Sequence, residues 1–591
     1  MKRLAWGALA SLLILSALLG SAWISKYRLL ALYLGISQPT HSGIVVKENV
    51  MVPMRDGVRL ATDLFLPKGE GPFPVILVRL PYGKDGARSM DLGRFQFRPA
   101  IFFTQRGNVL ITQDTRGRYA SEGDFYAFRD EREDGEDMLR WLKEQPWFNG
   151  SVATFGGSYF GFTQWALAPN AGTTLKCMVP LVITSDIYAS MFRGGAFSYL
   201  STGGWAMGVG ENKDGDLGKP KYEEGMWHLP LIDADEACVG DIDFYNDWLL
   251  HYKRDAYWDS INLCDDIQDI ETPSLLITGW YDLFVGDQVR DFNRLLEEAG
   301  GQAKESRLIV GPWVHGGVEG DVEFGKDASL VSVLPDVMNW FDYWLRDKGS
   351  LAGKPVRIFV MGENRWREES SWPPEKMQIQ PYYIHSQGNA RSADGNGTLD
   401  TTPPGTEEPM DRFTYNPADP VPTTGGTFLG PNMGPRDQTE VEKREDVLVY
   451  TTKPLTEPVE VTGPIRFVLY ASSSCEDTDF TAKLVDVHPD DLSINLQEGI
   501  IRARFRDPGK EEPLVPGEVY RYDIDLWSTS NLFLEGHRIR VQISSSNFPH
   551  FDRNLNIFGP YAHQTEMAVA KQIVYHDKER PSHILLPIVP R

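Results

Sequence analysis

The chain has 591 residues and a mass of 66.6 kDa, which at about 150 residues per domain indicates three or four domains. With 41% hydrophobic and 24% charged residues, its composition excludes a disordered or collagen-like protein. The 59 basic and 82 acidic residues give a net charge of −23, which disfavours nucleic acids and anionic lipid surfaces as main partners.

The first predicted element is an apolar segment at the N-terminus. Lys2 and Arg3 precede Leu4–Ser25, which carries no charge and would span about 33 Å as a helix. This length favours a membrane anchor over a secretory signal, whose apolar stretch is usually about 7–15 residues. Residues 20–22 (GSA) form an acceptable cleavage site, so removal stays open. In either case residues 1–40 are an anchor or signal segment, and we expect an exported protein that is membrane-anchored, periplasmic or secreted.

Strand-like and helix-like stretches then alternate in two parts of the chain. The predicted strands are Pro74–Leu80, Val109–Gln113, Ser151–Phe155, Ser274–Thr278 and Arg307–Val310. The predicted helices are Asp130–Glu144 and Asn339–Leu345. Such alternation favours a parallel sheet covered on both faces. The fold class is therefore α/β, with a core made from residues 41–185 and 271–375.

Residues 186–270 lie between the two parts of the core and differ from them in amino-acid composition. They are rich in Gly, Trp, Tyr and acidic residues, and Asp243–Leu250 is the best helical stretch, so we predict an inserted helical cap. For the acidic run Asp233–Glu236 we favour a solvated face over a metal site. The four cysteines of the chain show no metal-ligand spacing, and whether Cys238 and Cys264 pair stays open.

Residues 376–591 predict an all-β domain. Residues 388–426 are rich in Gly, Pro, Thr and acidic residues and indicate long loops. β-rich runs follow at Ile465–Tyr470, Phe480–Val487 and Arg538–Ile543, and the last alternates apolar with polar residues, which predicts one buried and one solvated face. Because no helical pattern separates these runs, we predict a β-sandwich of the jelly-roll type.

Ser158 has the surroundings of a nucleophilic serine. Gly156 and Gly157 precede it, a strand-like run ends before it and a helix-like run follows, as a nucleophile elbow requires. The start of that helix would offer free N–H groups to a developing oxyanion. The common G-x-S-x-G pattern places glycine two residues after the serine, whereas here Phe160 stands there and Gly161 follows.

A serine nucleophile needs a base and an orienting carboxylate, which in such sheets follow in the order Ser, Asp or Glu, His. Asp282 follows the predicted strand Ser274–Thr278, and His315 follows Arg307–Val310. Either residue alone would be an ordinary loop residue. Their order and their positions beyond strand ends together predict a Ser158–His315–Asp282 triad.

Several ordered blocks resemble the cocaine esterase and Xaa-Pro dipeptidyl-peptidase superfamily, from about residue 44 to the end. The blocks are residues 79–84 (RLPYGK), 114–117 (DTRG), 121–123 (SEG), 145–147 (QPW), 156–161 (GGSYFG), 279–282 (GWYD), 311–315 (GPWVH) and 545–554 (SSNFPHFDRN). The resemblance implies an α/β-hydrolase core, a helical cap and a C-terminal jelly roll. It also accounts for Gly161, because this family places its glycine three residues after the serine.

The resemblance assigns roles residue by residue. Ser158 matches the nucleophile, Asp282 the acid and His315 the base. Tyr82 matches the family's oxyanion tyrosine, whose hydroxyl acts with the backbone N–H of Tyr159; without the resemblance, Tyr82 would be a packed aromatic. The DTRG block beginning at Asp114 is expected to be structural. The mechanism implied is acyl transfer through an acyl-enzyme, and no metal or cofactor is expected.

The residues that follow Asp282 indicate which substrate class the site would accept. The family branch that acts on α-amino acid esters holds the substrate ammonium with carboxylates two and three residues beyond the acid, whereas Phe284 and Val285 stand here. An ammonium without a partner would be costly to bury. Phe284 resembles instead the aromatic wall of the cocaine esterase branch, although plain core packing is an equal alternative.

The leading hypothesis is therefore a serine esterase for small-molecule esters with an apolar or aromatic acyl group. An Xaa-Pro dipeptidyl-peptidase or an α-amino acid ester hydrolase or acylase is the first alternative. A non-catalytic surface protein that binds glycans or partners is an alternative of another class. The sequence does not predict the natural substrate or the oligomeric state.

Overall fold

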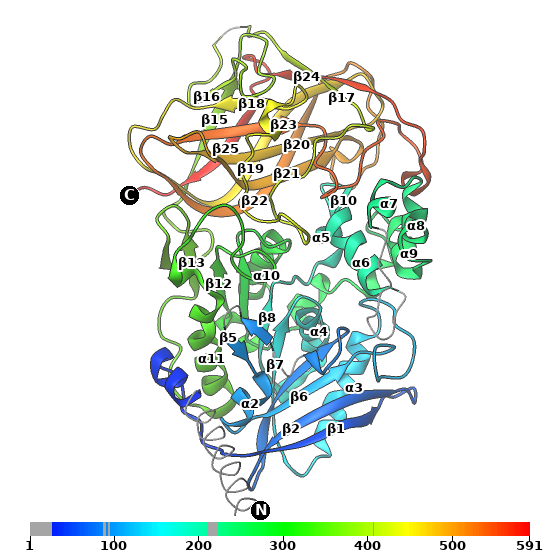
Figure 1. Cartoon of the computed structure of the whole chain (residues 1–591), viewed down its shortest axis with the longest axis vertical. Coiled ribbons are helices and arrows are strands. Elements are labelled where there is room, and N and C mark those ends of the chain that lie inside the picture. The colour runs from blue at the N-terminus through cyan, green and yellow to red at the C-terminus, as the bar shows by residue number, and fades with distance from the viewer. Residues whose placement is uncertain (1–26, 87–89, 93–94, 211–221, 406) are drawn as a thin grey trace, which may run out of the picture.

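The computed structural model describes residues 27–86, 90–92, 95–210, 222–405 and 407–591. Figure 1 shows a lower half that contains a mixed sheet with helices, an upper half built of strands, and a group of helices beside the junction. The apolar segment Leu4–Ser25 lies outside the described residues, and none of the described helices is long and apolar enough to cross a membrane.

The lower half is organised around a ten-stranded sheet in the order β1-β2-β6-β3-β7-β8-β11-β12-β13-β14. Strands β6 to β13 of that order run parallel, while β1, β2 and β14 are antiparallel to their neighbours. The strands are β1 (Ile44–Pro53), β2 (Arg59–Pro67), β3 (Phe73–Leu80), β6 (Val109–Asp114), β7 (Phe148–Gly157), β8 (Leu175–Leu181), β11 (Leu275–Gly279), β12 (Arg307–Gly311), β13 (Val356–Val360) and β14 (Arg365–Glu369).

Helices cover both faces of this sheet, which explains why central strands such as β3 are buried along their whole length. In β3, Val75 and Leu77 belong to one buried cluster, whereas Ile76 and Val78 belong to the other. The first cluster includes side chains of α3 (Glu131–Lys143), α4 (Tyr159–Leu167) and α10 (Val285–Glu297), and the second includes α2 (Pro99–Thr104) and α11 (Leu334–Arg346). The predicted α/β core is thus confirmed.

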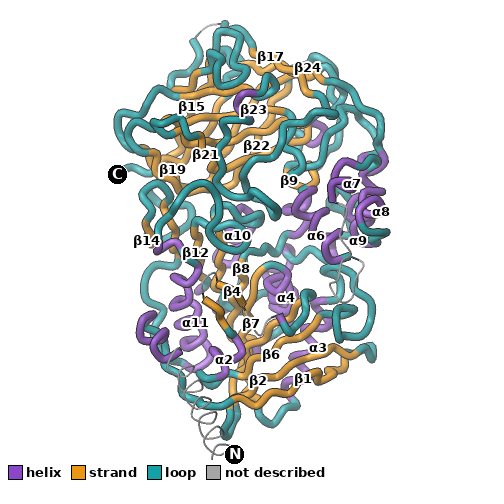
Figure 2. The backbone as a smooth tube through the Cα atoms, viewed as in Figure 1, coloured by secondary structure: helices purple, strands orange, loops and turns teal. Residues whose placement is uncertain are grey.

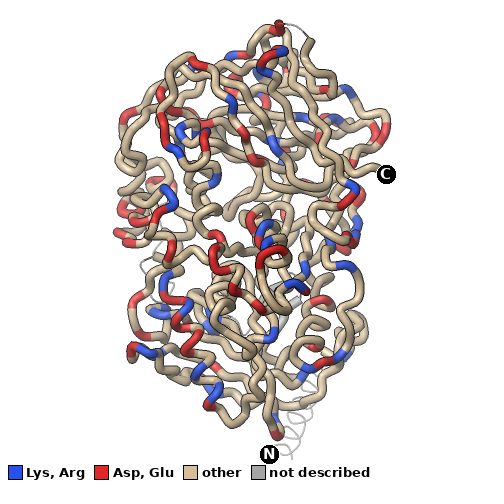
Figure 3. The backbone as a smooth tube through the Cα atoms, turned by 180° about the vertical axis from the view of Figure 1, so that it is seen from behind, with Lys and Arg blue, Asp and Glu red and all other residues tan. Residues whose placement is uncertain are grey.

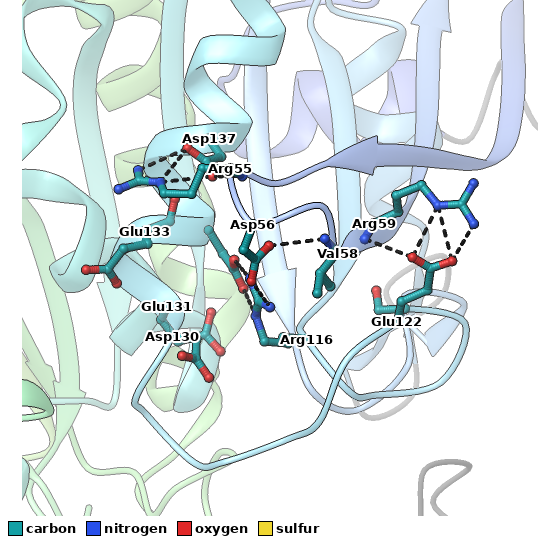
Figure 4. A network of polar contacts seen from close by, with 12 residues as sticks. Arg55, Asp56, Val58, Arg59, Arg116, Glu122, Asp130, Glu131, Glu133 and Asp137 are labelled. Carbon is teal, nitrogen blue, oxygen red and sulfur yellow. Dashed lines mark hydrogen bonds and ion pairs between the residues drawn. The ribbon is translucent and has the colours of Figure 1, made fainter.

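The N-terminal hairpin is fastened to α3 by ion pairs (Figure 4). Arg55 contacts Asp137 at 3.0 Å, and Arg116 contacts both Asp56 and Asp134 at 2.6 Å. Arg116 belongs to the DTRG block, whose Asp114 carboxylate accepts the backbone N–H of Lys84 at 2.6 Å. This block therefore ties the sheet edge to the loop that follows Tyr82.

Helices and two short strands occupy the chain between β8 and β11, and they lie beside the junction of the two halves (Figure 1). They are α5 (Ile187–Met191), β9 (Phe192–Arg193), β10 (Ala196–Phe197), α6 (Gly204–Val209), α7 (Tyr222–Trp227), α8 (Ala234–Cys238) and α9 (Asp243–Leu250). The solvated face expected for 233–236 is wrong at Asp235, which is fully buried and accepts the N–H of Ile242 at 2.7 Å. Cys238 and Cys264 do not form a disulfide with each other.

The upper half contains an eleven-stranded, mostly antiparallel sheet folded into a sandwich, with long loops between the strands (Figure 2). Two of its strands, β16 and β17, lie within 388–426, so that stretch is not entirely loop. The strands are β15 (Gln378–His385), β16 (Thr398–Asp400), β17 (Asp411–Tyr415), β18 (Leu448–Thr451), β19 (Val459–Ser473), β20 (Asp479–Val487), β21 (Ser493–Arg502), β22 (Tyr520–Phe533), β23 (Arg538–Ser544), β24 (Ala570–Tyr575) and β25 (His583–Ile588).

In β23 the predicted alternation is present, but the solvated face is wrong. Ile539 and Val541 are fully buried, yet Arg540 and Gln542 on the other face are also buried, at 8% and 4% exposure. The short 3-10 helix Val441–Lys443 supplies Glu442 to that face, where Glu442 pairs with Arg540 at 2.5 Å and accepts a hydrogen bond from Gln542 at 2.9 Å. Elsewhere, acidic and basic positions are interspersed over both halves in the view from behind (Figure 3).

Candidate active site

Ser158 occupies a sharp turn between β7 and α4. Its φ of 56° and ψ of −131° are sparsely populated for a residue with a side chain, a strain that is typical of functional sites. The Ser158 N–H donates to Leu181 O at 3.0 Å, which holds the turn against the end of β8. The helix begins at the next residue, so the first N–H groups of α4 have no acceptor within the helix.

Two glycines make this turn sterically feasible. Gly156 has a φ of +146°, and a Cβ there would lie 2.5 Å from the Cβ of Phe160. A Cβ on Gly161 would lie 2.3 Å from the Cγ2 of Ile183, which follows β8. The close approach of α4 to the chain after β8 thus explains why glycine is needed three residues after Ser158 rather than two.

Asp282 and His315 meet at the ends of adjacent parallel strands, β11 and β12. His315 Nδ1 and Asp282 Oδ2 are 2.7 Å apart, and Asp282 is fully buried. The second oxygen of Asp282 accepts the backbone N–H of Phe284 at 2.9 Å. A carboxylate held in this way fixes the proton of His315 on Nδ1 and leaves Nε2 as the free base.

Ser158 and His315 line one cavity, together with Tyr82, Tyr159 and Phe284. With Asp282 behind His315, the structure brings all six predicted site residues together. The other residues that line the cavity are Phe128, Ile183, Ile187, Ser190, Met191, Ser201, Thr202, Trp205, Leu283 and Leu429.

The Tyr82 hydroxyl is positioned by two neighbours. It accepts a hydrogen bond from Trp205 Nε1 at 2.8 Å and also interacts with the Ser158 side chain. Burial raises the pKa of Tyr82 to about 12, although both hydrogen bonds act in the opposite direction. The phenol therefore keeps its proton at neutral pH and can donate a hydrogen bond to an anion beside Ser158.

The side chain of Tyr159 is fixed by a buried polar group. Its hydroxyl donates to Glu131 Oε1 at 3.0 Å and accepts the N–H of Phe128 at 2.9 Å. Arg79 pairs with the other oxygen of Glu131 at 2.9 Å. Burial raises the pKa of Glu131 to about 7, while the Arg79 charge opposes that rise. The buried pair of Glu131 and Arg79 therefore holds Tyr159 in place, and Tyr159 is the first residue of α4.

Sequence reasoning did not find Trp205 or Glu131. Trp205 lies in α6, about 120 residues beyond Tyr82 (positions 205 and 82), and the sequence around it shows only an aromatic between small residues. Glu131 is one of several acidic residues in α3, and Asp134 and Asp137 of the same helix are buried as well. Neither carries a local signal that separates it from its neighbours.

The cavity wall is chiefly apolar and aromatic. Within the described part of the chain, the residues that line it include no Asp or Glu. The ring of Phe284 lies 5.9 Å from the ring of His315, so it borders the place where an acyl group would bind. A cationic substrate would find no carboxylate partner among these lining residues.

Comparisons with known proteins cover both halves of the chain. Residues 56–317 match the model of the X-Pro dipeptidyl-peptidase (S15 family), and residues 352–585 match the X-Pro dipeptidyl-peptidase C-terminal non-catalytic domain. Cocaine esterase of Rhodococcus sp. (strain MB1 Bresler) is 41% identical over 576 residues, covering 92% of this chain and 99% of that protein.

Solved structures match over almost the whole length. An aminopeptidase from the marine sediment archaeon Thaumarchaeota archaeon has a TM-score of 0.80 at 26% identity, covering 93% of this chain and 97% of its own. An α-amino acid ester hydrolase has a TM-score of 0.77 at 25% identity, covering 94% and 98%. These chains share both the mixed-sheet core and the all-β domain.

Proposed function

Because the chain belongs to the cocaine esterase and X-Pro dipeptidyl-peptidase (S15) family of serine hydrolases, we propose that Ser158, His315 and Asp282 are its catalytic triad. The observation that carries this assignment is the 2.7 Å contact of His315 with buried Asp282, in a cavity that Ser158 also lines. The strained turn at Ser158 supports it, since such backbone strain clusters at active sites.

In the proposed reaction, the Ser158 hydroxyl attacks the ester carbonyl while His315 Nε2 accepts its proton. Asp282 stabilises the resulting imidazolium. The tetrahedral oxyanion accepts hydrogen bonds from the Tyr82 hydroxyl and the Tyr159 N–H. Collapse of this intermediate breaks the C–O bond, and His315 gives the proton to the leaving alcohol. Water then attacks the acyl-enzyme with His315 again as the base, which releases the acid and regenerates Ser158.

For substrate class, we favour carboxylic esters with an apolar or aromatic acyl group. The apolar cavity wall and the position of Phe284 beside His315 support this choice. The name of the Rhodococcus relative is that of an esterase, whereas the archaeal structural neighbour is an aminopeptidase, so peptide-like substrates are the competing class.

A substrate panel separates the two classes. Purified protein is assayed with aryl esters of acetic, butyric and benzoic acid and with Ala-Pro and Gly-Pro anilides. We expect the esters to give the higher kcat/KM by at least tenfold. A clear preference for the anilides would assign the chain to the peptidases instead, while no turnover of either class would support a binding protein.

We also propose that the apolar segment Leu4–Ser25 directs the protein out of the cytoplasm. Its length and the preceding Lys2 and Arg3 support export. Fractionation of cells that express the full chain with a C-terminal tag tests this, and mass spectrometry of the intact protein shows whether the segment is retained. Recovery of the uncleaved chain in the cytoplasm would contradict the proposal.

A further inference from the structure

A second group of chemically competent side chains lies in the all-β half, outside the catalytic cavity. Asp486 is in β20, His488 follows the end of that strand, and His537 directly precedes β23. Ligand atoms of these three residues all lie within 4.8 Å of one another. The two imidazole rings are 4.5 Å apart at an interplanar angle of 37°.

Strand geometry explains why these residues converge. Residues i and i+2 of a strand point to the same face, so Asp486 and His488 share one side of the sheet. Strands β20 and β23 are antiparallel neighbours in which Val487 faces Arg538, and extending that register by one places His488 opposite His537. Directly opposed residues have Cβ atoms about 4.5–5.5 Å apart, which suits a shared ligand.

The surroundings orient the three side chains. His537 Nδ1 lies 2.8 Å from Asp486 Oδ1, and the amide of Asn531 donates to the other oxygen of Asp486 at 3.3 Å. Such outer hydrogen bonds are typical of carboxylates that bind metals. Asp486 and His537 are buried, while His488 is half-buried and leaves a route from solvent.

We propose that Asp486, His488 and His537 form a binding site for a divalent transition-metal ion such as Zn²⁺. Two imidazoles and one carboxylate suit zinc, which takes His nitrogen and Asp oxygen at about 2.0–2.2 Å in a tetrahedron. Ligands at that distance lie about 3.3 Å apart, so small side-chain rotations bring the three atoms into place. A water molecule would complete the coordination.

The position of the site assigns it a structural role. Asn531 belongs to β22, and its neighbours Ser530 and Leu532 exchange backbone hydrogen bonds of 2.9 and 2.8 Å with Met361, just beyond β13 of the lower half. A metal ion that fixes Asp486 would therefore stabilise the junction between the two halves. The ion would act through stability and would take no part in the chemistry at Ser158.

The test measures zinc binding by the whole chain after EDTA treatment and desalting. Isothermal titration with ZnCl₂ is expected to give one site per chain, and scanning calorimetry is expected to give a higher Tm with zinc. His488→Ala is expected to weaken binding at least 100-fold and to abolish the Tm rise. Co²⁺ in place of zinc is expected to give visible d–d absorption bands that the variant lacks.

His385→Ala is the matched control, because His385 also pairs with a carboxylate, Glu408, at 2.9 Å in the same half of the molecule. This variant is expected to bind zinc as the parent chain does. Absence of stoichiometric binding, or binding that survives His488→Ala, would overturn the proposal. Loss in His385→Ala instead would place the zinc elsewhere. Where His488→Ala fails to fold, His488→Gln provides the comparison.

Discussion

At the scale of single residues, a few side chains set the protonation states of the site. The Asp282–His315 contact fixes one proton, and burial of the Tyr82 phenol keeps another in place at neutral pH. Both groups are arranged before substrate binds, which is the condition for strong electrostatic stabilisation of a transition state.

Tyr82→Phe removes one proposed oxyanion donor and leaves the ring in place. We expect kcat for an aryl ester to fall about 10²–10³-fold with little change in KM, because the donor acts mainly in the transition state. Trp205→Phe is the companion variant, since it removes the N–H that contacts the Tyr82 hydroxyl and keeps a smaller aromatic ring at a position that stacks on Phe128 and Tyr159. It should cost much less than Tyr82→Phe. A Tyr82→Phe enzyme within twofold of the parent chain would refute the assigned role.

Phe284→Ala tests the acyl-binding wall. Removing the ring should lower kcat/KM for butyryl and benzoyl esters about tenfold, because apolar contact with the acyl group is lost. The acetyl ester has less surface to lose and should be affected less. Steady-state kinetics on the three esters measures this difference. An equal loss for all three would indicate that Phe284 only packs the core beside His315.

The triad could be proposed from the sequence because each of its residues follows a strand whose apolar run is visible there. Tyr82 carried no such signal, and only the resemblance assigned it a role. Trp205 and Asp235 show what local sequence cannot supply. Trp205 contacts Tyr82, which is distant in the sequence. Asp235 is buried by the packing of the surrounding helices, although it lies in an acidic run.

At the scale of elements, the close approach of α4 to the end of β8 controls the nucleophile turn. Gln164 fastens the same helix, since its side chain accepts the Val179 N–H and donates to Gly156 O, both at 3.0 Å. The strand before Ser158, the helix after it and the neighbouring strand thus form one rigid unit.

Gly161→Ala would place a methyl group 2.3 Å from Ile183 Cγ2. We expect a loss of about 1–3 kcal/mol in the free energy of unfolding, because the packed core must shift to admit it, and a fall in kcat from displacement of the turn. Gly405→Ala is the control, since no heavy atom lies within 4 Å of its added Cβ. Urea denaturation and esterase assays measure both. Equal stability of the two variants would contradict the packing argument.

Elements were predictable where burial made whole strands apolar, as in β3, and less so where polar residues are buried. In β23, Arg540 has the polar position that the alternation predicts, but it is buried and pairs with Glu442 of a short 3-10 helix about 100 residues away (positions 442 and 540). The register that brings His488 and His537 together is likewise a property of strand pairing, which one sequence does not encode locally.

At the scale of the whole molecule, buried charges join the helices beside the junction to the all-β half. Arg193 of β9 donates to the backbone oxygen of Glu498 in β21 and stacks over the Trp527 ring at 3.5 Å. The Glu498 carboxylate contacts His550 at 3.1 Å and accepts the N–H of Thr427 at 3.1 Å. These contacts hold the cavity wall in place from outside the catalytic core.

Glu498 makes this junction sensitive to acid. Burial raises its pKa, but hydrogen bonding to His550 and the charges of Lys483 and Arg193 outweigh burial and lower the pKa to about 2. The unfolded carboxyl has a pKa of about 4.3 and binds the proton first, so this stabilisation is present above that pH and is lost as the pH falls toward 2.

Glu498→Gln removes that dependence. We expect it to lower the free energy of unfolding at pH 7 by about 3–5 kcal/mol, since it breaks a buried charged group, and to flatten the decline between about pH 5 and pH 2. Denaturant unfolding at a series of pH values measures both effects. A variant with the parent chain's stability and pH slope would show that Glu498 does not support the junction.

The most direct test of the central claim is covalent labelling of the proposed nucleophile. The full chain is treated with a fluorophosphonate, and the modified peptide is identified by mass spectrometry. We predict stoichiometric labelling on Ser158, loss of labelling and of ester hydrolysis in Ser158→Ala, and labelling at least 10³-fold slower in His315→Ala. Labelling of another residue, or ester hydrolysis that persists in Ser158→Ala, would contradict the account.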